Sequence, residues 1–152
     1  MPTGRFIALG GATMKSFFNF VIIVIAMMIV MSCSDNKTMD KFFSAIRQVE
    51  TGGLKDNGIG AIGDKGKSYG PYQIQYNYWK DANMKYGTWE RCLTDEAYSR
   101  EVMMKYLRRY AKDALEQGDW QTLARIHNGG PKGHTRTSTK KYWTKVYKEL
   151  QK

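Results

Sequence analysis

Two carboxyl side chains, Glu50 and Asp64, stand in contrasting sequence surroundings. Phe43, Ile46 and Glu50 are spaced at i, i+3 and i+7, so on a helix Glu50 extends an apolar face at the C-terminal, negative end. That environment favours a protonated carboxyl, which a general acid needs. Asp64 lies in a polar, glycine-rich stretch and is expected to stay ionised. A protonated and an ionised carboxyl together are what cleavage of a glycosidic bond requires.

This pair does not establish an active site by itself, because most Glu and Asp residues at such a spacing are solvated surface groups. The pattern of the surrounding sequence predicts the helices and strands on which the two carboxyls lie. A helix is expected to begin near Asp40, a favourable N-cap, and to end at Gly52-Gly53. Residues 54–75 contain five glycines and predict turns and short strands. Further helices are expected over 76–85, from Thr94 as N-cap to near Gly118, over 120–127 and over 142–150. The sequence therefore predicts an α+β domain.

The N-terminal part of the chain has the layout of a secretory signal. Phe17 to Met31 is a nearly unbroken apolar run that follows Lys15, and it is shorter than the roughly 20 apolar residues that span a bilayer. Met14, directly before Lys15, makes a better start than Met1. A membrane anchor helix is the alternative.

The end of this run, Val30-Met31-Ser32-Cys33, resembles a bacterial lipoprotein signal, in which the cysteine is lipidated and becomes the new N-terminus. Met31 departs from the small residue that is usual there, and ordinary cleavage near Cys33 is the alternative. We predict a signal peptide over 1–33, a polar tether over 34–39 and a catalytic domain over 40–152. The protein is then exported, as a cell-envelope lipoprotein or in secreted form.

The net charge and the number of cysteines limit the kinds of binding partner, disulfide and metal site that can be expected. The net charge is +10, and it falls to +8 when Arg5 and Lys15 are removed with the signal. A basic surface suits a polyanion, and the export signal disfavours nucleic acid. Cys92 is the one cysteine after Cys33, so no internal disulfide is expected within the mature chain, and no zinc-like spacing occurs. We expect no metal, no cofactor and a monomer.

Several sequence blocks resemble the invertebrate-type lysozyme, or destabilase, family, and the resemblance covers residues 42–147. The blocks occur in the family's order: Glu50-Thr51-Gly52-Gly53, Asp64, Tyr69-Gly70-Pro71-Tyr72-Gln73-Ile74, Tyr78-Trp79, Trp89-x-x-Cys92-x-x-Asp95, Arg108-Arg109-Tyr110 and Ala124-Arg125-Ile126-His127-Asn128-Gly129-Gly130-Pro131.

The resemblance implies a lysozyme-like fold and hydrolysis of the β-1,4 bond between N-acetylmuramic acid and N-acetylglucosamine in peptidoglycan. It assigns the catalytic carboxyls to Glu50 and Asp64, with Asp56 as the fallback for the second. It also implies substrate-binding residues on both walls of a groove: Ser68, Tyr72, Gln73, Ile74, His127, Asn128 and Gly129.

Departures from the family pattern also matter. Animal members are rich in disulfides, whereas Cys92 has no partner, which fits a bacterial member. Gln75 and Lys67 stand where some members carry the lysine and serine of an isopeptidase activity, so we expect none here. Two other functions stay open: a lytic transglycosylase, which needs only Glu50, and a wall-binding lipoprotein without turnover.

Overall fold

The computed structural model describes the backbone of residues 12–152 and the side chains of residues 18–22, 24 and 37–152. The chain divides at Met39 into two compact units. In the described part, the first unit is helical and belongs to helix α1 (Ala12–Thr51). Within the residues described, no helix combines the length and hydropathy needed to cross a membrane.

Helix α1 differs from the helix expected to begin near Asp40. It starts at Ala12 and continues through residues 34–39, so the predicted tether is helical. Residues 12–51 contain no glycine or proline, and nothing in their sequence ends a helix. The backbone of Cys33 belongs to α1, but its side chain lies outside the described residues. The signal peptide and its cleavage point therefore stay predictions.

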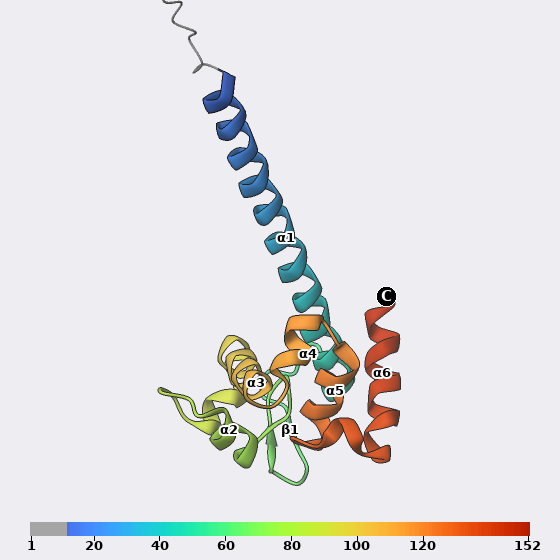
Figure 1. The fold of residues 1–152 in the computed structure, drawn as a ribbon. Coiled ribbons are helices and arrows are strands. Elements are labelled where there is room, and N and C mark those ends of the chain that lie inside the picture. The colour runs from blue at the N-terminus through green and yellow to red at the C-terminus, as the bar shows by residue number, and fades with distance from the viewer. Residues whose placement is uncertain (1–11) are drawn as a thin grey trace, which may run out of the picture. The chain divides into compact units, whose positions relative to one another are not determined.

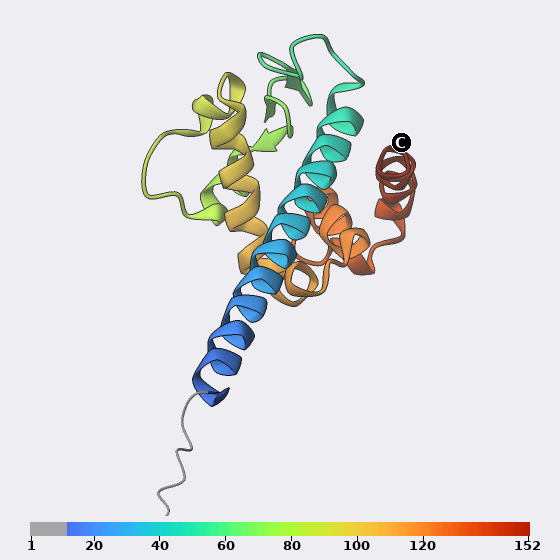
Figure 2. The same ribbon diagram turned by 90° about the horizontal axis from the view of Figure 1, so that it is seen from above.

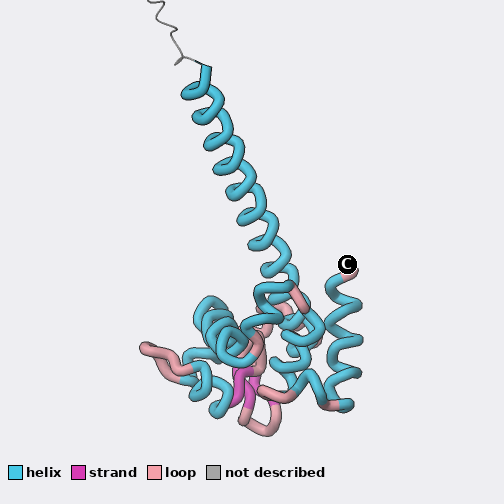
Figure 3. Tube along the Cα trace, viewed as in Figure 1, coloured by secondary structure: helices cyan, strands magenta, loops and turns pink. Residues whose placement is uncertain are grey.

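The second unit, Asp40–Lys152, contains short helices and one small sheet (Figure 1). Its sheet is antiparallel, in the order β1-β2-β3, and Figure 3 shows the strands gathered in one place. The strands are β1 (Ile62–Gly63), β2 (Ser68–Tyr69) and β3 (Ile74–Gln75). The α-helices that follow are α2 (Tyr76–Ala82), α3 (Glu96–Tyr110), α4 (Lys112–Gln117), α5 (Trp120–Gly129) and α6 (Lys140–Leu150). The 3-10 helices are η1 (Trp89–Leu93), η2 (Gly133–Thr135) and η3 (Thr137–Thr139). This is the predicted α+β architecture.

Residues 40–51 of α1 form the centre of the core. The ring of Phe42 lies 5.2 Å from that of Trp120 on α5, and the ring of Phe43 lies 5.6 Å from that of Tyr72. Figure 2 shows α3 on one side of this segment and α5 with α6 on the other. Each fully buried Phe or Ile here contributes about 1.5–3 kcal/mol, so packing anchors the segment that ends at Glu50.

The helix expected between Thr94 and Gly118 is two helices. Asp95, not Thr94, is the N-cap of α3, because its carboxylate accepts a hydrogen bond from the Tyr98 N–H at 2.9 Å and its charge suits the helix N-terminus. Ala111 leaves the helical conformation and separates α3 from α4, while Gly118 ends α4 as predicted. Ala111 and Ala114 are both buried, so the bend keeps the apolar stripe on the core.

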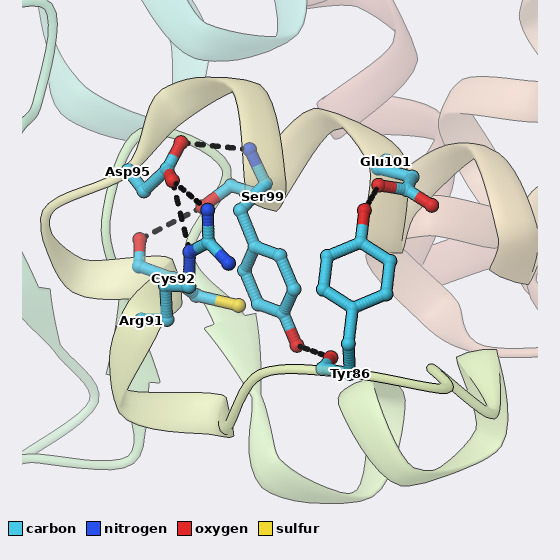
Figure 4. Close-up of polar contacts among 7 residues, drawn as sticks. Tyr86, Arg91, Cys92, Asp95, Ser99 and Glu101 are labelled. Atoms are coloured by element: carbon cyan, nitrogen blue, oxygen red, sulfur yellow. Dashed lines mark hydrogen bonds and ion pairs between the residues drawn. The ribbon is translucent and has the colours of Figure 1, made fainter.

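Polar contacts hold η1 against α3 where no disulfide is available (Figure 4). Cys92 is buried and free, and burial raises the pKa of its thiol to about 12. Its carbonyl accepts from the Ser99 hydroxyl at 2.8 Å. Arg91 donates to Asp95 at 2.7 Å and lies over the Tyr98 ring at 4.7 Å. These contacts connect η1 to the start of α3.

Gly70 is the position in the β region where a side chain is least tolerated. Its φ is +72°, and an added Cβ would lie 1.8 Å from the Cys92 carbonyl oxygen. We expect Gly70→Ala to lower the free energy of unfolding by about 3 kcal/mol or more, because backbone strain and a backbone clash add. Gly60→Ala is the control, since φ is +77° there and nothing lies within 4 Å. Urea titrations that give equal losses for both variants would contradict this.

Candidate active site

Glu50 and Asp64 line one cleft, with a volume of about 500 Å³. Glu50 comes from the C-terminal end of α1, and Asp64 from the hairpin between β1 and β2. Side chains from α2, α3 and α5 complete the cleft. The other residues that line it are Gly63, Ser68, Gln73, Gln75, Asn77, Tyr78, Asp81, Tyr106, His127, Asn128, Gly130 and Pro131.

Glu50 is held through one of its two oxygens. Tyr142 of α6 donates to Oε1 at 2.6 Å, and His127 Nε2 of α5 lies 3.4 Å from the same oxygen. The Glu50 side chain is 17% exposed. Within the described residues, Oε2 has no hydrogen-bonding partner. The carboxyl is therefore oriented by the protein on one side and available to a ligand on the other.

His127 is positioned in turn by aromatic residues. Its Nδ1 lies 3.1 Å from the Tyr78 hydroxyl, and the Tyr78 ring stacks on Tyr106 at 3.6 Å. Burial, together with neighbouring Tyr106 and Glu50, raises the pKa of Tyr78 well above its ordinary value. Burial and the Glu50 charge do the same for the pKa of Tyr142. Both hydroxyls therefore keep their protons at neutral pH and remain able to donate.

Asp64 is held by the strand register. Ser68 pairs with Gly63 on one side and with Gln75 on the other, which brings both side chains to the hairpin. The Ser68 hydroxyl donates to Asp64 Oδ2 at 2.8 Å, and Gln75 Nε2 donates to the same oxygen at 3.0 Å. Asp64 is exposed and has a φ of +49°. The two hydrogen bonds hold one oxygen of this carboxyl group in place.

The expected groove residues divide into two groups. Ser68, Gln73, His127 and Asn128 do line the cleft. Tyr72, Ile74 and Gly129 do not. Tyr72 and Ile74 are 1% and 0% exposed, because their side chains fill the core beneath the sheet. A Cβ on Gly129 would meet Thr139 at 2.5 Å, so this glycine faces the η3 segment. These three residues contribute to the packing of the domain and not to the lining of the cleft.

Tyr142 and Gln75, which contact the two carboxyls directly, were not identified from the sequence. Tyr142 belongs to a helical apolar pattern, and nothing in that pattern distinguishes a core tyrosine from one that bonds a carboxyl 92 residues away. In the sequence, Gln75 is notable only because it stands where some family members carry a lysine. Asp56, the fallback carboxylate, is exposed and does not line the cleft.

Trp79 and Trp89 form hydrogen bonds within the domain. Trp79 and Trp89 are partly buried and donate to the Tyr98 hydroxyl and the Ile74 carbonyl, each at 2.8 Å. Neither lines the cleft. In the part of the chain that the structure describes, no group of three His, Cys, Asp or Glu residues is arranged to hold a metal ion.

The fold and the two-carboxyl cleft together define a lysozyme-like protein, and solved structures agree. The Tapes japonica lysozyme is 34% identical, with a TM-score of 0.60 over 71% of this chain and 87% of that one. Meretrix lusoria lysozyme in complex with Aeromonas hydrophila PliI is 31% identical, with a TM-score of 0.59 over the same shares.

Sequence comparison then identifies the family. The Destabilase family model matches residues 32–149. An invertebrate-type lysozyme from Ruditapes philippinarum is 35% identical over 102 residues, which are 66% of this chain and 74% of that protein. A lysozyme from Ostrea edulis is 29% identical over 83% of this chain and 91% of its own length. The chain belongs to the invertebrate-type lysozyme, or destabilase, family.

Proposed function

We propose that this protein is a muramidase that hydrolyses the β-1,4 bond between N-acetylmuramic acid and N-acetylglucosamine in peptidoglycan. The observation that carries the proposal is the cleft shared by Glu50 and Asp64, in which each carboxyl has one oxygen bonded to the protein. Lysozyme activity of the relatives supports the same reaction.

The two carboxyls perform different parts of the reaction. Glu50, largely buried and oriented by Tyr142, gives its proton to the oxygen of the leaving sugar as the glycosidic bond breaks. Asp64, ionised in its polar hairpin, stabilises or attacks the positive centre that develops at the anomeric carbon. Water supplies the new hydroxyl at that carbon, and its proton returns to a carboxylate. The product carries a free reducing end.

Digestion of peptidoglycan by the full chain, with the soluble muropeptides identified by mass, tests this function. We expect muropeptides with reducing ends. Products that end in anhydro sugars instead would identify a lytic transglycosylase. Wall binding by folded protein without release of fragments would leave only a binding function.

Tyr142 is proposed as the residue that positions Glu50. A typical hydrogen bond is worth about 0.5–1.5 kcal/mol, so we expect Tyr142→Phe to lower kcat about three- to tenfold with little change in KM. Tyr147→Phe is the matched control, because Tyr147 lies on the same helix and is 50% exposed. Steady-state rates on soluble glycan oligomers check this. Full activity of Tyr142→Phe, or a rise in KM alone, would contradict the role.

We also propose that the chain is exported as a monomer, cleaved before Cys33 and lipidated at that residue. The lipoprotein-like sequence that ends at Cys33 supports this. The mass of the mature protein from a bacterial membrane fraction is the test. A mass without acyl chains, or with residues 1–32 still attached, would contradict the anchor.

A further inference from the structure

The positive charge of this protein is concentrated in one segment. Between Asp119 and Glu149 the sequence has seven Lys or Arg residues and no Asp or Glu. Since the whole chain has a net charge of +10, this segment accounts for most of the excess. A distribution of this kind creates a local positive potential rather than a uniformly basic surface.

Six of these seven side chains are exposed, and we call them the basic face. They are Lys132, Arg136, Lys140, Lys141, Lys145 and Lys148. Among the described residues, none of the six forms an ion pair. The seventh, Arg125, is buried and donates to neutral oxygens, Thr139 Oγ1 at 3.0 Å and the Arg136 carbonyl at 2.9 Å. Its charge therefore adds to the potential, and its bonds hold the loop that carries the face.

Helix α6 presents its lysines as a row. Lys141, Lys145 and Lys148 follow at i, i+4 and i+7, so they share one side of the helix and are separated by about 6 and 4.5 Å along its axis. Val146 is fully buried, and Tyr142 reaches Glu50 on the inner side. The lysine row therefore lies on a different side of α6 from the side that packs on the core.

The basic face begins at the edge of the cleft. Asn128, Gly130 and Pro131 line the cleft, and Lys132 follows directly in the chain. Tyr142, which bonds Glu50, directly follows Lys140 and Lys141 in the chain. A polymer attached to a glycan strand in the cleft therefore meets this surface, and binding at two linked sites strengthens both.

We propose that the basic face docks an anionic wall polymer with repeating phosphate groups, carried by the same wall whose glycan enters the cleft. Lysine ammonium groups are compact charges that bind phosphate without a fixed bidentate geometry, which suits a flexible polymer. The statement that the glycan in the cleft comes from a cell wall rests on the proposed function. The docking surface itself rests on the charge and exposure of residues 132–148.

The test compares two triple variants of the full chain. Lys141→Gln, Lys145→Gln and Lys148→Gln remove three charges from the basic face. Lys55→Gln, Lys85→Gln and Arg108→Gln remove three exposed charges from other elements. Binding is measured by cold sedimentation with cell walls that carry a phosphate polymer, and with the same walls after hydrofluoric acid has removed it. Cleavage of soluble glycan oligomers that contain the bond between N-acetylmuramic acid and N-acetylglucosamine is measured in parallel.

We expect the α6 triple variant to bind intact walls about tenfold more weakly at low salt, and the difference to vanish at about 1 M salt, where screening is nearly complete. On stripped walls and soluble oligomers it should match the wild type. Equal weakening of the control variant, or a loss that persists on stripped walls, would overturn the proposal. So would a larger loss of binding to anionic vesicles or to DNA than to walls. If wild type cleaves no oligomer yet shows the binding difference, the proposed function fails and the docking surface stands.

Discussion

Glu50→Gln is expected to reduce hydrolysis of peptidoglycan by about 10²- to 10⁴-fold, the usual contribution of a positioned general acid. The glutamine side chain has nearly the same shape, and its amide oxygen can still accept from Tyr142, which bonds Oε1 at 2.6 Å. It has no acidic proton to give to a leaving oxygen. The loss should therefore appear in kcat, with the fold and substrate binding retained.

The control for this prediction is Glu116→Gln. Glu116 is exposed on α4 and lies 3.6 Å from Lys112, so the substitution removes the same charge without touching the cleft. Its rate should match the wild type. If Glu50→Gln kept more than a tenth of the wild-type kcat, Glu50 would not be the acid, whatever the effect on KM.

Asp64→Asn is expected to lower the rate about 100-fold or more, because it removes the negative charge that faces the developing positive centre. The substitution also disturbs the Ser68 and Gln75 bonds, since both converge on Oδ2. An amide offers only one acceptor oxygen in place of two. Rates and muropeptide masses together report the loss of charge and any change of product.

Asp56→Asn is the matched control, because Asp56 is the other carboxylate that the sequence offered for this role. It is exposed and outside the cleft, so its substitution should leave the rate unchanged. A large loss at Asp56 with none at Asp64 would transfer the assignment. Anhydro products that persist in Asp64→Asn would instead favour a transglycosylase, which does not need the second carboxylate.

The fold was predictable because its signals are local. Helical periodicity located α2, α5 and α6 to within a few residues, and five closely spaced glycines located the β region. Two expected helix boundaries differ from the structure. Nothing in residues 34–39 stops a helix, so α1 continues through the expected tether. The break at Ala111 keeps Ala114 in the core. The spacing of apolar residues alone does not predict where a helix bends.

The site was predictable in part, and the limit again follows from distance along the chain. Ser68, Gln73, His127 and Asn128 belong to blocks of the family resemblance, and the structure brings them to the same cleft. Tyr72 and Ile74 belong to such blocks too, but their side chains are buried in the core, whereas those of Gln73 and Gln75 line the cleft. Only the tertiary structure shows which of these side chains face the cleft.

Residue types, their periodicity and the charges can be read from the chain, so the sequence supplies Glu50 and Asp64 as candidate carboxyls, the α+β class and the concentration of positive charge before Glu149. The residues that hold the two carboxyls are seen only in the tertiary structure. Tyr142 comes from the last helix to bond Glu50, and the strand register brings Ser68 and Gln75 to Asp64. Such contacts depend on packing between distant segments, because the directions of side chains are set by their neighbours in space.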